Sequence, residues 1–223
     1  MKNPHLICYD FDGTLCNTLP DIAASMNAVF RHYGFDGISE ERVRDFIGSG
    51  ITKLVERSVF HVMSGHDETT VPPEKIMEIT KAMAVHYSAH LTDRSHLYPG
   101  VIDILEHFSG TRQIVVSNKP EMMVRDMLAH YGIGHYFDLV VGGDTLDVCK
   151  PDPGVWQFIK KTLALPGKLR GVMVGDSVPD VRFGKIAGLL TVAVSYGYND
   201  VPRLIEEGAD AIIDSLTDLI AVC

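Results

Sequence analysis

The stretch that decides the fold is Leu6-Ile7-Cys8-Tyr9-Asp10-Phe11-Asp12-Gly13-Thr14-Leu15. A short apolar run leads into two carboxylates, Asp10 and Asp12, and Gly13 then allows the backbone to turn sharply. This pattern predicts a buried β-strand that delivers acidic groups to its carboxyl end. In open α/β sheets that edge is where ligands bind.

Asp10 and Asp12 are too close to ionise together easily unless a cation lies between them or one of them stays protonated. A magnesium site with one nucleophilic and one acid/base carboxylate would meet both conditions. An Asp-Gly turn whose carboxylates cap backbone amides is the simpler alternative. The rest of the chain has to decide between the two.

The composition is that of an ordinary globular protein, with 223 residues of which 46% are hydrophobic and 22% charged. The formal net charge of -9 argues against a nucleic-acid partner and against a polybasic membrane patch. A small anionic partner remains possible, because its binding depends on a few local cations and a metal.

The four cysteines form no CxxC pair, so neither a zinc site nor a redox motif is indicated, and we expect reduced thiols. The first residues lack the apolar region of a signal peptide. No apolar run approaches the ~20 residues that a membrane-spanning helix needs. We therefore expect a cytoplasmic protein without a membrane partner.

After Leu15 the strand-like runs disappear for some eighty residues and helical patterns take over. Thr18 and Ser39 are suitable helix N-caps, and Pro72-Pro73 can open a longer helix. Gly34 and the segment 48–50 are expected to end helices, and residues 64–70 to form a loop.

From Tyr98 onward apolar runs alternate with helical patterns, which predicts a parallel sheet covered by helices on its faces. The expected fold is thus α/β, a doubly wound parallel-sheet core of residues 1–15 and 98–223 with an inserted all-helical cap, residues 16–97. Further strands of this core are expected at residues 113–116, 137–141, 171–174, 190–194 and 211–213.

Three later strands also end in polar groups. Ser117 offers a hydroxyl and backbone amides at a helix start, as an anion cradle or as a plain N-cap. Lys150 precedes Pro151-Asp152-Pro153 and would be a rigidly placed ammonium or a solvated surface lysine. Asp176 and Asp180 would ligate a hard cation and orient its surroundings, or cap a helix.

Taken together, these clusters resemble the haloacid dehalogenase superfamily, whose fold is a Rossmann-like core with an inserted cap. The resemblance covers essentially the whole chain. Its four motifs are matched by Asp10-Phe11-Asp12-Gly13-Thr14, by Ser117, by Lys150, and by Gly175-Asp176 with Asp180.

The resemblance implies a phosphatase in which Asp10 is the nucleophile and Asp12 the general acid and base. It implies Mg²⁺ bound by the Asp10 carboxylate, the Asp12 backbone carbonyl and Asp176. It also places Ser117, Asn118 and Lys150 around the phosphoryl oxygens. The role of Asp180, as a ligand or as an orienting group, stays open.

Within the superfamily the chain is most similar to the phosphoglycolate phosphatases, which implies 2-phosphoglycolate as the small phosphorylated substrate. The informative cap segments are Ile47-Gly48-Ser49-Gly50-Ile51 and Leu54-Val55-Glu56-Arg57. Their glycines would let the backbone approach a small carboxylate, with Arg57 or Lys53 nearby, or they would only break a helix ahead of an ordinary surface basic residue. Other phosphatases, for pyrophosphate, sugar phosphates or nucleotides, and a phosphoglucomutase-like phosphotransferase share the core motifs. A non-catalytic phosphate-binding module is the alternative of another class, and a monomer or a homodimer is expected.

Overall fold

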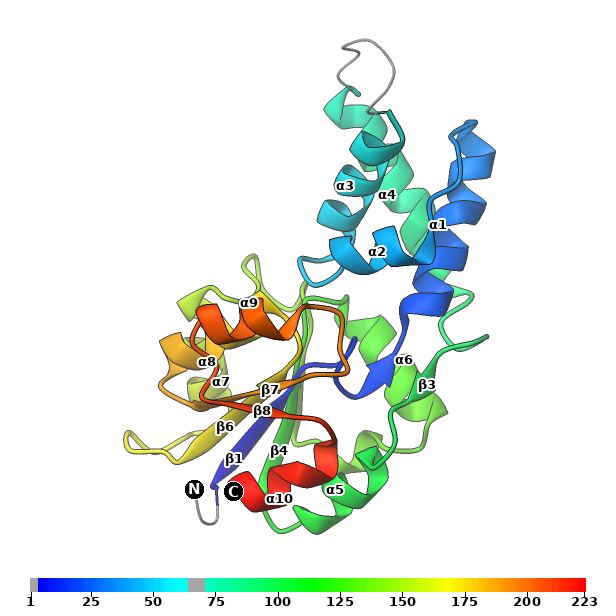
Figure 1. The fold of residues 1–223 in the computed structure, drawn as a ribbon. Coiled ribbons are helices and arrows are strands. Elements are labelled where there is room, and N and C mark those ends of the chain that lie inside the picture. The colour runs from blue at the N-terminus through cyan, green and yellow to red at the C-terminus, as the bar shows by residue number, and fades with distance from the viewer. Residues whose placement is uncertain (1–3, 64–70) are drawn as a thin grey trace. The chain divides into compact units, whose positions relative to one another are not determined.

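The computed structural model describes residues 4–63 and 71–223, so the loop expected at 64–70 lies outside the described part. The chain divides into two compact units, one of residues 1–17 with 97–223 and the other of residues 18–96 (Figure 1). We call them the core unit and the helical unit. The domain limits expected from the sequence, after residue 15 and before residue 98, stay a prediction.

The core unit is built on a parallel six-stranded sheet in the order β5-β4-β1-β6-β7-β8. This arrangement confirms the predicted fold class. The strands are β1 (Leu6–Tyr9), β4 (Arg112–Val116), β5 (Leu139–Val141), β6 (Gly171–Gly175), β7 (Leu190–Val194) and β8 (Ala211–Ile213). Two short connecting strands, β2 (Cys16–Asn17) and β3 (His96–Leu97), pair with each other.

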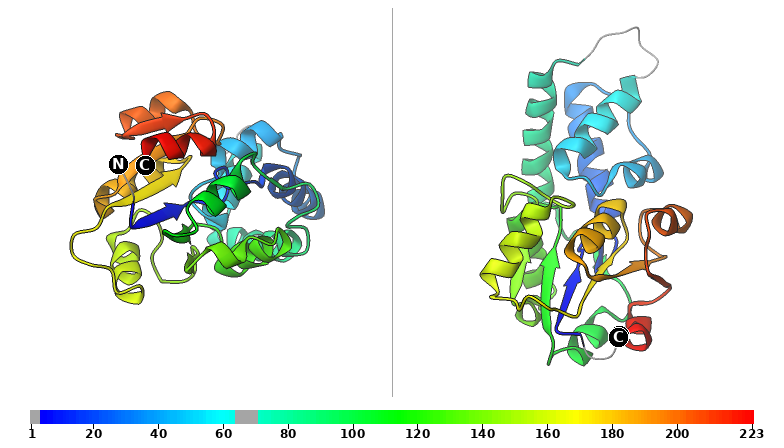
Figure 2. Two further views of the ribbon diagram at one scale, coloured as in Figure 1. Left: turned by 90° about the horizontal axis from the view of Figure 1, so that it is seen from below. Right: turned by 90° about the vertical axis from the view of Figure 1, so that its left-hand side faces the viewer.

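Helices lie on both sides of this sheet (Figure 2). They are α5 (Val101–His107), α6 (Glu121–His130), α7 (Pro153–Thr162), α8 (Val178–Ala187), α9 (Val201–Glu206) and α10 (Leu219–Val222). Because side chains alternate along a strand, Leu6 and Cys8 face one side, where they share an apolar cluster with Trp156 of α7 and Phe183 of α8. Tyr9 faces the other side and donates to Gln113, whose side-chain amide donates to the Leu105 carbonyl in α5.

The register of the sheet brings three loops together at one edge. Tyr9 pairs with Val115 of β4 and with Val174 of β6, so the residues that follow these strands are neighbours. The Asp10 amide continues the ladder and donates to the Val174 carbonyl at 2.9 Å. Asp10 is thereby fixed between Ser117, after β4, and Asp176, after β6.

The helical unit consists of α1 (Leu19–Tyr33), α2 (Glu40–Phe46), α3 (Ile51–Met63) and α4 (Pro73–Ser88). The Ser39 side chain accepts from the Arg42 amide at the start of α2, as its sequence position predicts. Gly34 ends α1 in a left-handed conformation, with φ of 74°. Neither these helices nor the others in the described residues combine the length and apolar character needed to cross a membrane.

Candidate active site

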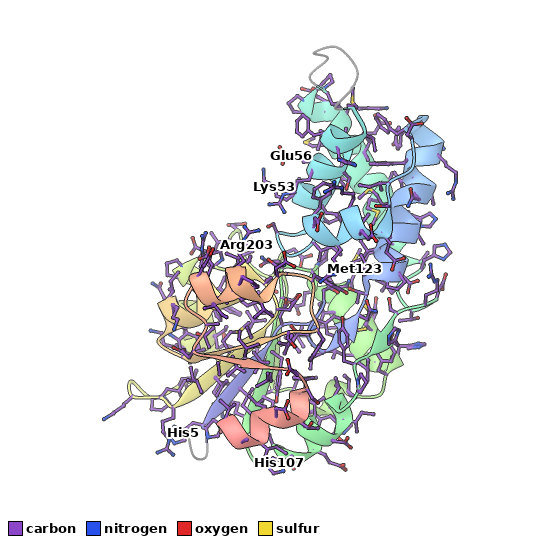
Figure 3. The ribbon with its side chains drawn as sticks, in the orientation of Figure 1. His5, Lys53, Glu56, His107, Met123 and Arg203 are labelled. Carbon is purple, nitrogen blue, oxygen red and sulfur yellow. The ribbon has the colours of Figure 1, made fainter. Side chains whose placement is uncertain are left out.

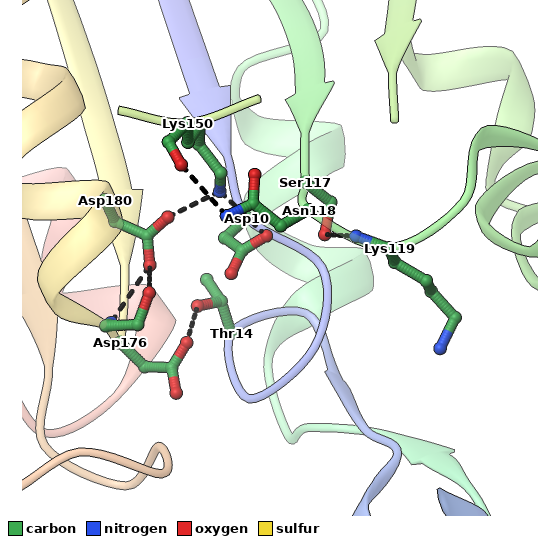
Figure 4. Close-up of polar contacts among 9 residues, drawn as sticks. Asp10, Thr14, Ser117, Asn118, Lys119, Lys150, Asp176 and Asp180 are labelled. Atoms are coloured by element: carbon green, nitrogen blue, oxygen red, sulfur yellow. Dashed lines mark hydrogen bonds and ion pairs between the residues drawn. The ribbon is translucent and has the colours of Figure 1, made fainter. Parts of the chain in front are cut away.

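Asp10 lies at the tip of an inner strand with its side chain buried (Figure 4). Lys150 Nζ is 3.0 Å from Asp10 Oδ1, yet this oxygen accepts no hydrogen bond of good geometry. Burial raises the pKa of Asp10 to about 6, helped by the charge of Asp180 and opposed by Lys150 and Ser117. Asp10 is therefore a buried carboxylate whose own surroundings do not fully satisfy it.

Lys150 connects two of the motif carboxylates. Its Nζ is 2.5 Å from Asp180 Oδ1 and 3.0 Å from Asp10 Oδ1, and its side chain is 2% exposed. Burial alone would lower the pKa of Lys150, but Asp10 and Asp180 together raise it above its ordinary value. The group is thus a permanent ammonium beside Asp10, held from behind by Asp180.

Asp180 is fully engaged in this role. Its second oxygen, Oδ2, accepts from the Ser177 amide at 2.9 Å and from the Ser177 hydroxyl at 2.6 Å. Ser177 and Asp180 form a capping box at the start of α8, so the helix-capping alternative and the orienting role apply to the same residue.

Asp176 is held in a close-fitting cradle. Its Oδ1 accepts from the Thr14 hydroxyl at 3.1 Å and its Oδ2 from the Tyr198 amide at 2.7 Å. A Cβ atom on Gly13 or on Gly197 would overlap the Asp176 side chain, and Gly13 has φ of 80°. Burial raises the pKa of Asp176 well above its usual range, with Asp10 and Asp180 adding to the effect.

Ser117 and Asn118 follow β4 and are both buried at this edge. Asn118 Nδ2 donates to the Lys150 carbonyl at 3.1 Å, so it ties its own loop to the loop that carries the lysine. The structure therefore brings together Asp10, Ser117, Lys150, Asp176 and Asp180 from four loops far apart in sequence.

Asp12 has a partner that the sequence analysis missed. Lys119 Nζ lies 3.0 Å from Asp12 Oδ1, and the lysine side chain is 2% exposed. The segment Ser117-Asn118-Lys119-Pro120 marks the place of Lys119 in this loop, but its pairing with Asp12 depends on tertiary packing. Tyr198, by contrast, donates to Asp176 with its backbone amide, which any residue except Pro could offer, so no sequence signal marked it.

A metal ion fits this edge of the sheet. Asp10, Asp176 and Asp180 can each offer one oxygen, and these oxygens lie within 4.8 Å of one another. Asp10 and Asp176 have raised pKa values because each is buried near like charges, which is the environment that a cation would relieve. Asp180 is already ion-paired with the Lys150 ammonium, whereas Thr14 and Tyr198, which donate to Asp176, are neutral, so Asp10 and Asp176 are the better candidates for ligands.

In the helical unit, the two basic residues expected near a substrate carboxylate have partners of their own (Figure 3 labels Lys53 and Glu56). Lys53 pairs with Glu56 at 2.6 Å, one turn along α3. Arg57 donates to the Phe46 carbonyl at 3.1 Å and to the Ser49 hydroxyl at 3.4 Å, so it braces the loop 47–50. Their predicted contact with a substrate stays a prediction.

Comparison with known families matches residues 7–194 to a family described as haloacid dehalogenase-like hydrolase. The chain belongs to this family. Its relatives include phosphoglycolate phosphatases from Pseudomonas fluorescens, 36% identical over 99% of this chain and 80% of the relative, and from Vibrio cholerae, 35% identical over 100% of this chain and 98% of the relative. The crystal structure of a predicted phosphoglycolate phosphatase from Haemophilus somnus 129PT has a TM-score of 0.91 at 31% identity, covering 100% of this chain and 99% of that one.

These findings confirm the predicted family and the prediction that the chain is an enzyme, a hydrolase similar to phosphoglycolate phosphatases. In this haloacid dehalogenase-like hydrolase, the cluster at the strand tips combines a poorly satisfied carboxylate, a buried ammonium and a carboxylate pair that suits a hard cation. Such a set can position an anionic group and stabilise charge on it.

Proposed function

We propose that this enzyme is a magnesium-dependent phosphatase that hydrolyses a small phosphate monoester through an aspartyl-phosphate, with 2-phosphoglycolate as its substrate. The observation that carries the proposal is the state of Asp10. It stands at a fixed strand tip, buried, beside the Lys150 ammonium, with one oxygen that accepts no well-formed hydrogen bond.

In the first step, an Asp10 carboxylate oxygen attacks phosphorus, and the bond from phosphorus to the ester oxygen breaks. Asp12 gives its proton to the departing alkoxide, which leaves as the alcohol. In the second step, Asp12 takes a proton from water, which attacks the same phosphorus. The bond to Asp10 then breaks, releasing inorganic phosphate and restoring both carboxylates to their starting forms.

The remaining groups hold the phosphoryl oxygens and balance their charge. Lys150 supplies a permanent positive charge next to Asp10, and Ser117 supplies a hydroxyl at the end of β4. Asp10, the Asp12 backbone carbonyl and Asp176 would hold Mg²⁺. When bound, this ion adds positive charge that favours the ionised carboxylates and offsets charge on the phosphoryl group.

The choice of substrate rests on relatives. Several proteins similar over nearly the whole chain, from Pseudomonas and Vibrio species, are named phosphoglycolate phosphatase. In the helical unit, the Arg57 guanidinium braces a loop with glycines at positive φ, Gly48 and Gly50. Backbone amides of such a loop are suited to binding a small carboxylate, which 2-phosphoglycolate carries.

The test is phosphate release from 2-phosphoglycolate, a sugar phosphate, a nucleotide and pyrophosphate, each with Mg²⁺ or with chelator. We expect turnover that requires Mg²⁺ and is fastest with 2-phosphoglycolate. Asp10→Asn should reduce it by a factor of about 10⁴ or more, because the nucleophile is lost. Faster turnover of another ester would overturn the substrate alone, whereas full activity of Asp10→Asn would overturn the mechanism.

A further inference from the structure

The ion pair between Lys119 and Asp12 is almost wholly shielded from water. The side chains are 2% and 14% exposed, and Nζ to Oδ1 measures 3.0 Å (Figure 4 shows Lys119). Burying an ammonium is costly unless it is paired, so this pair is a specific feature and not a surface contact. For comparison, Lys53 and Glu56 form a pair on α3 with 58% and 35% of the side chains exposed.

The backbone of Lys119 is fixed independently of this pair. Its carbonyl accepts from the Gly143 amide at 2.8 Å, and its amide lies 3.4 Å from the Ser117 hydroxyl. Gly143 lies so close to the Asn118 backbone that a Cβ atom there would overlap it. These contacts restrain the backbone of Lys119 in the same loop as Ser117, and they keep its ammonium within reach of Asp12.

The site thus contains two buried lysines with different carboxylates. Lys150 contacts Asp10 and Asp180, and Lys119 contacts Asp12. A carboxyl group that must exchange a proton with an oxygen of the substrate needs a defined rotation about its Cβ–Cγ bond. A contact to one of its two oxygens supplies that restraint.

We propose that Lys119 is a positioning residue, which holds Asp12 through Oδ1 so that the carboxyl group faces the leaving oxygen of the ester. This inference rests on the acid/base role of Asp12 in the proposed function. It assigns Lys119 no contact with the phosphoryl group, which distinguishes it from Lys150.

This role has a kinetic signature. Departure of an alkoxide needs a proton from Asp12, whereas p-nitrophenolate leaves readily without one. Removing the ammonium should therefore slow formation of the aspartyl-phosphate from alkyl esters much more than from p-nitrophenyl phosphate. A lysine that merely supported the fold or held the phosphoryl group would affect both esters equally.

The experiment compares kcat and KM of the parent chain and Lys119→Met with 2-phosphoglycolate and with p-nitrophenyl phosphate. Met keeps the unbranched length and removes the charge. We expect kcat/KM, which reports formation of the aspartyl-phosphate and not its later hydrolysis, to fall about 100-fold for the first ester and less than about tenfold for the second, within the range of general acid catalysis. Lys150→Met is the matched comparison and should slow both esters to a similar degree.

A double-mutant cycle supplies the second readout. If Lys119 acts through Asp12, then Lys119→Met should cause no further loss of kcat/KM for 2-phosphoglycolate once Asp12→Asn is present. Lys119→Arg keeps a positive charge and should retain the leaving-group pattern of the parent, which covers the case in which Lys119→Met does not fold.

Equal losses of Lys119→Met on both esters, or additive losses in the cycle, would overturn the inference. Its failure is distinguishable from that of the proposed function. If Asp12→Asn itself lowers kcat/KM equally for both esters, the role of Asp12 as the general acid for the leaving group is wrong. If Asp12→Asn discriminates between them but Lys119→Met does not, only the role of Lys119 is wrong.

Discussion

Asp21 in the helical unit and Asp10 in the core unit are both buried aspartates, but they differ in how fully their carboxylates are hydrogen-bonded. Asp21, in the first turn of α1, is 1% exposed and Asp10 is 5% exposed. Asp21 accepts from the Arg94 amide, the Ser95 amide and the Ser95 hydroxyl at 2.7 to 3.0 Å. Asp10 has an oxygen that accepts no well-formed hydrogen bond.

The difference separates a structural carboxylate from a chemical one. Asp21 accepts hydrogen bonds from residues 94 and 95 of the helical unit, and these bonds join α1 to that segment. The carboxylate of Asp21 therefore stabilises local structure. Asp10 keeps part of its hydrogen-bonding capacity, and its pKa is raised to about 6 chiefly by burial. Three substitutions of aspartate by asparagine test this contrast.

The largest effect on stability is expected at Asp21. In Asp21→Asn an amide NH₂ would face backbone N–H donors, leaving buried groups unsatisfied. We expect the free energy of unfolding to fall by about 3 kcal/mol, measured by urea unfolding followed by far-UV circular dichroism. A loss below ~0.5 kcal/mol would mean that the hydrogen bonds of Asp21 do not stabilise the helical unit.

Asp10→Asn, in contrast, should increase the stability of the folded protein at pH 7. In the metal-free protein the folded-state pKa of about 6 exceeds the ordinary value of 3.8, so folding favours the protonated form. The stability that this group contributes is present below about pH 4 and is lost as the pH rises through about 6. Asp10→Asn should therefore raise the melting temperature at pH 7 and flatten its dependence on pH in this range.

Magnesium gives a control for this second prediction. At pH 7, adding Mg²⁺ should raise the melting temperature of the parent chain and have a smaller effect on Asp10→Asn, because the variant lacks one carboxylate ligand. If the metal-free Asp10→Asn variant is less stable than the parent at pH 7, then the buried, ionised carboxylate of Asp10 does not destabilise the folded protein, and the prediction is wrong.

The smallest effect is expected at Asp45 on α2, which pairs with Arg42 at 3.3 Å with both side chains more than half exposed. Asp45→Asn should change the free energy of unfolding by less than ~0.5 kcal/mol, because water screens an exposed pair. The measurement is the urea unfolding used for Asp21→Asn. A larger loss would show that the contrast between buried and exposed aspartates is weaker than the geometry indicates.

Much of the site could be predicted because each motif follows a strand of a parallel sheet. Once Leu6–Tyr9 and Gly171–Gly175 are recognised as strands of a parallel sheet, their carboxyl ends lie at the same edge, and so do Asp10 and Asp176; the structure adds that the two strands are neighbours. The helix starts at Ser39 and Pro73 were likewise marked by their own residues. At these positions the residues themselves were sufficient to predict the local structure.

Contacts between distant side chains could not be predicted in this way. The pairs Lys119 with Asp12 and Asp21 with Ser95 depend on tertiary packing, and no local pattern encodes them. The strand expected from Phe137 begins instead at Leu139, because a 3₁₀ turn at Gly134–Tyr136 precedes it and the Phe137 ring packs edge-on against Tyr9. Tertiary context decided those residues.

The hydrogen bond from the Asp10 amide to the Val174 carbonyl has a consequence for how the proposed nucleophile moves. This amide is the last rung of the ladder between two inner strands, so it can exchange with deuterated solvent only when the centre of the sheet opens. The carboxyl carbon of Asp10 is therefore only three bonds from a backbone amide that we expect to exchange slowly, and side-chain rotation is the main freedom that the carboxylate retains.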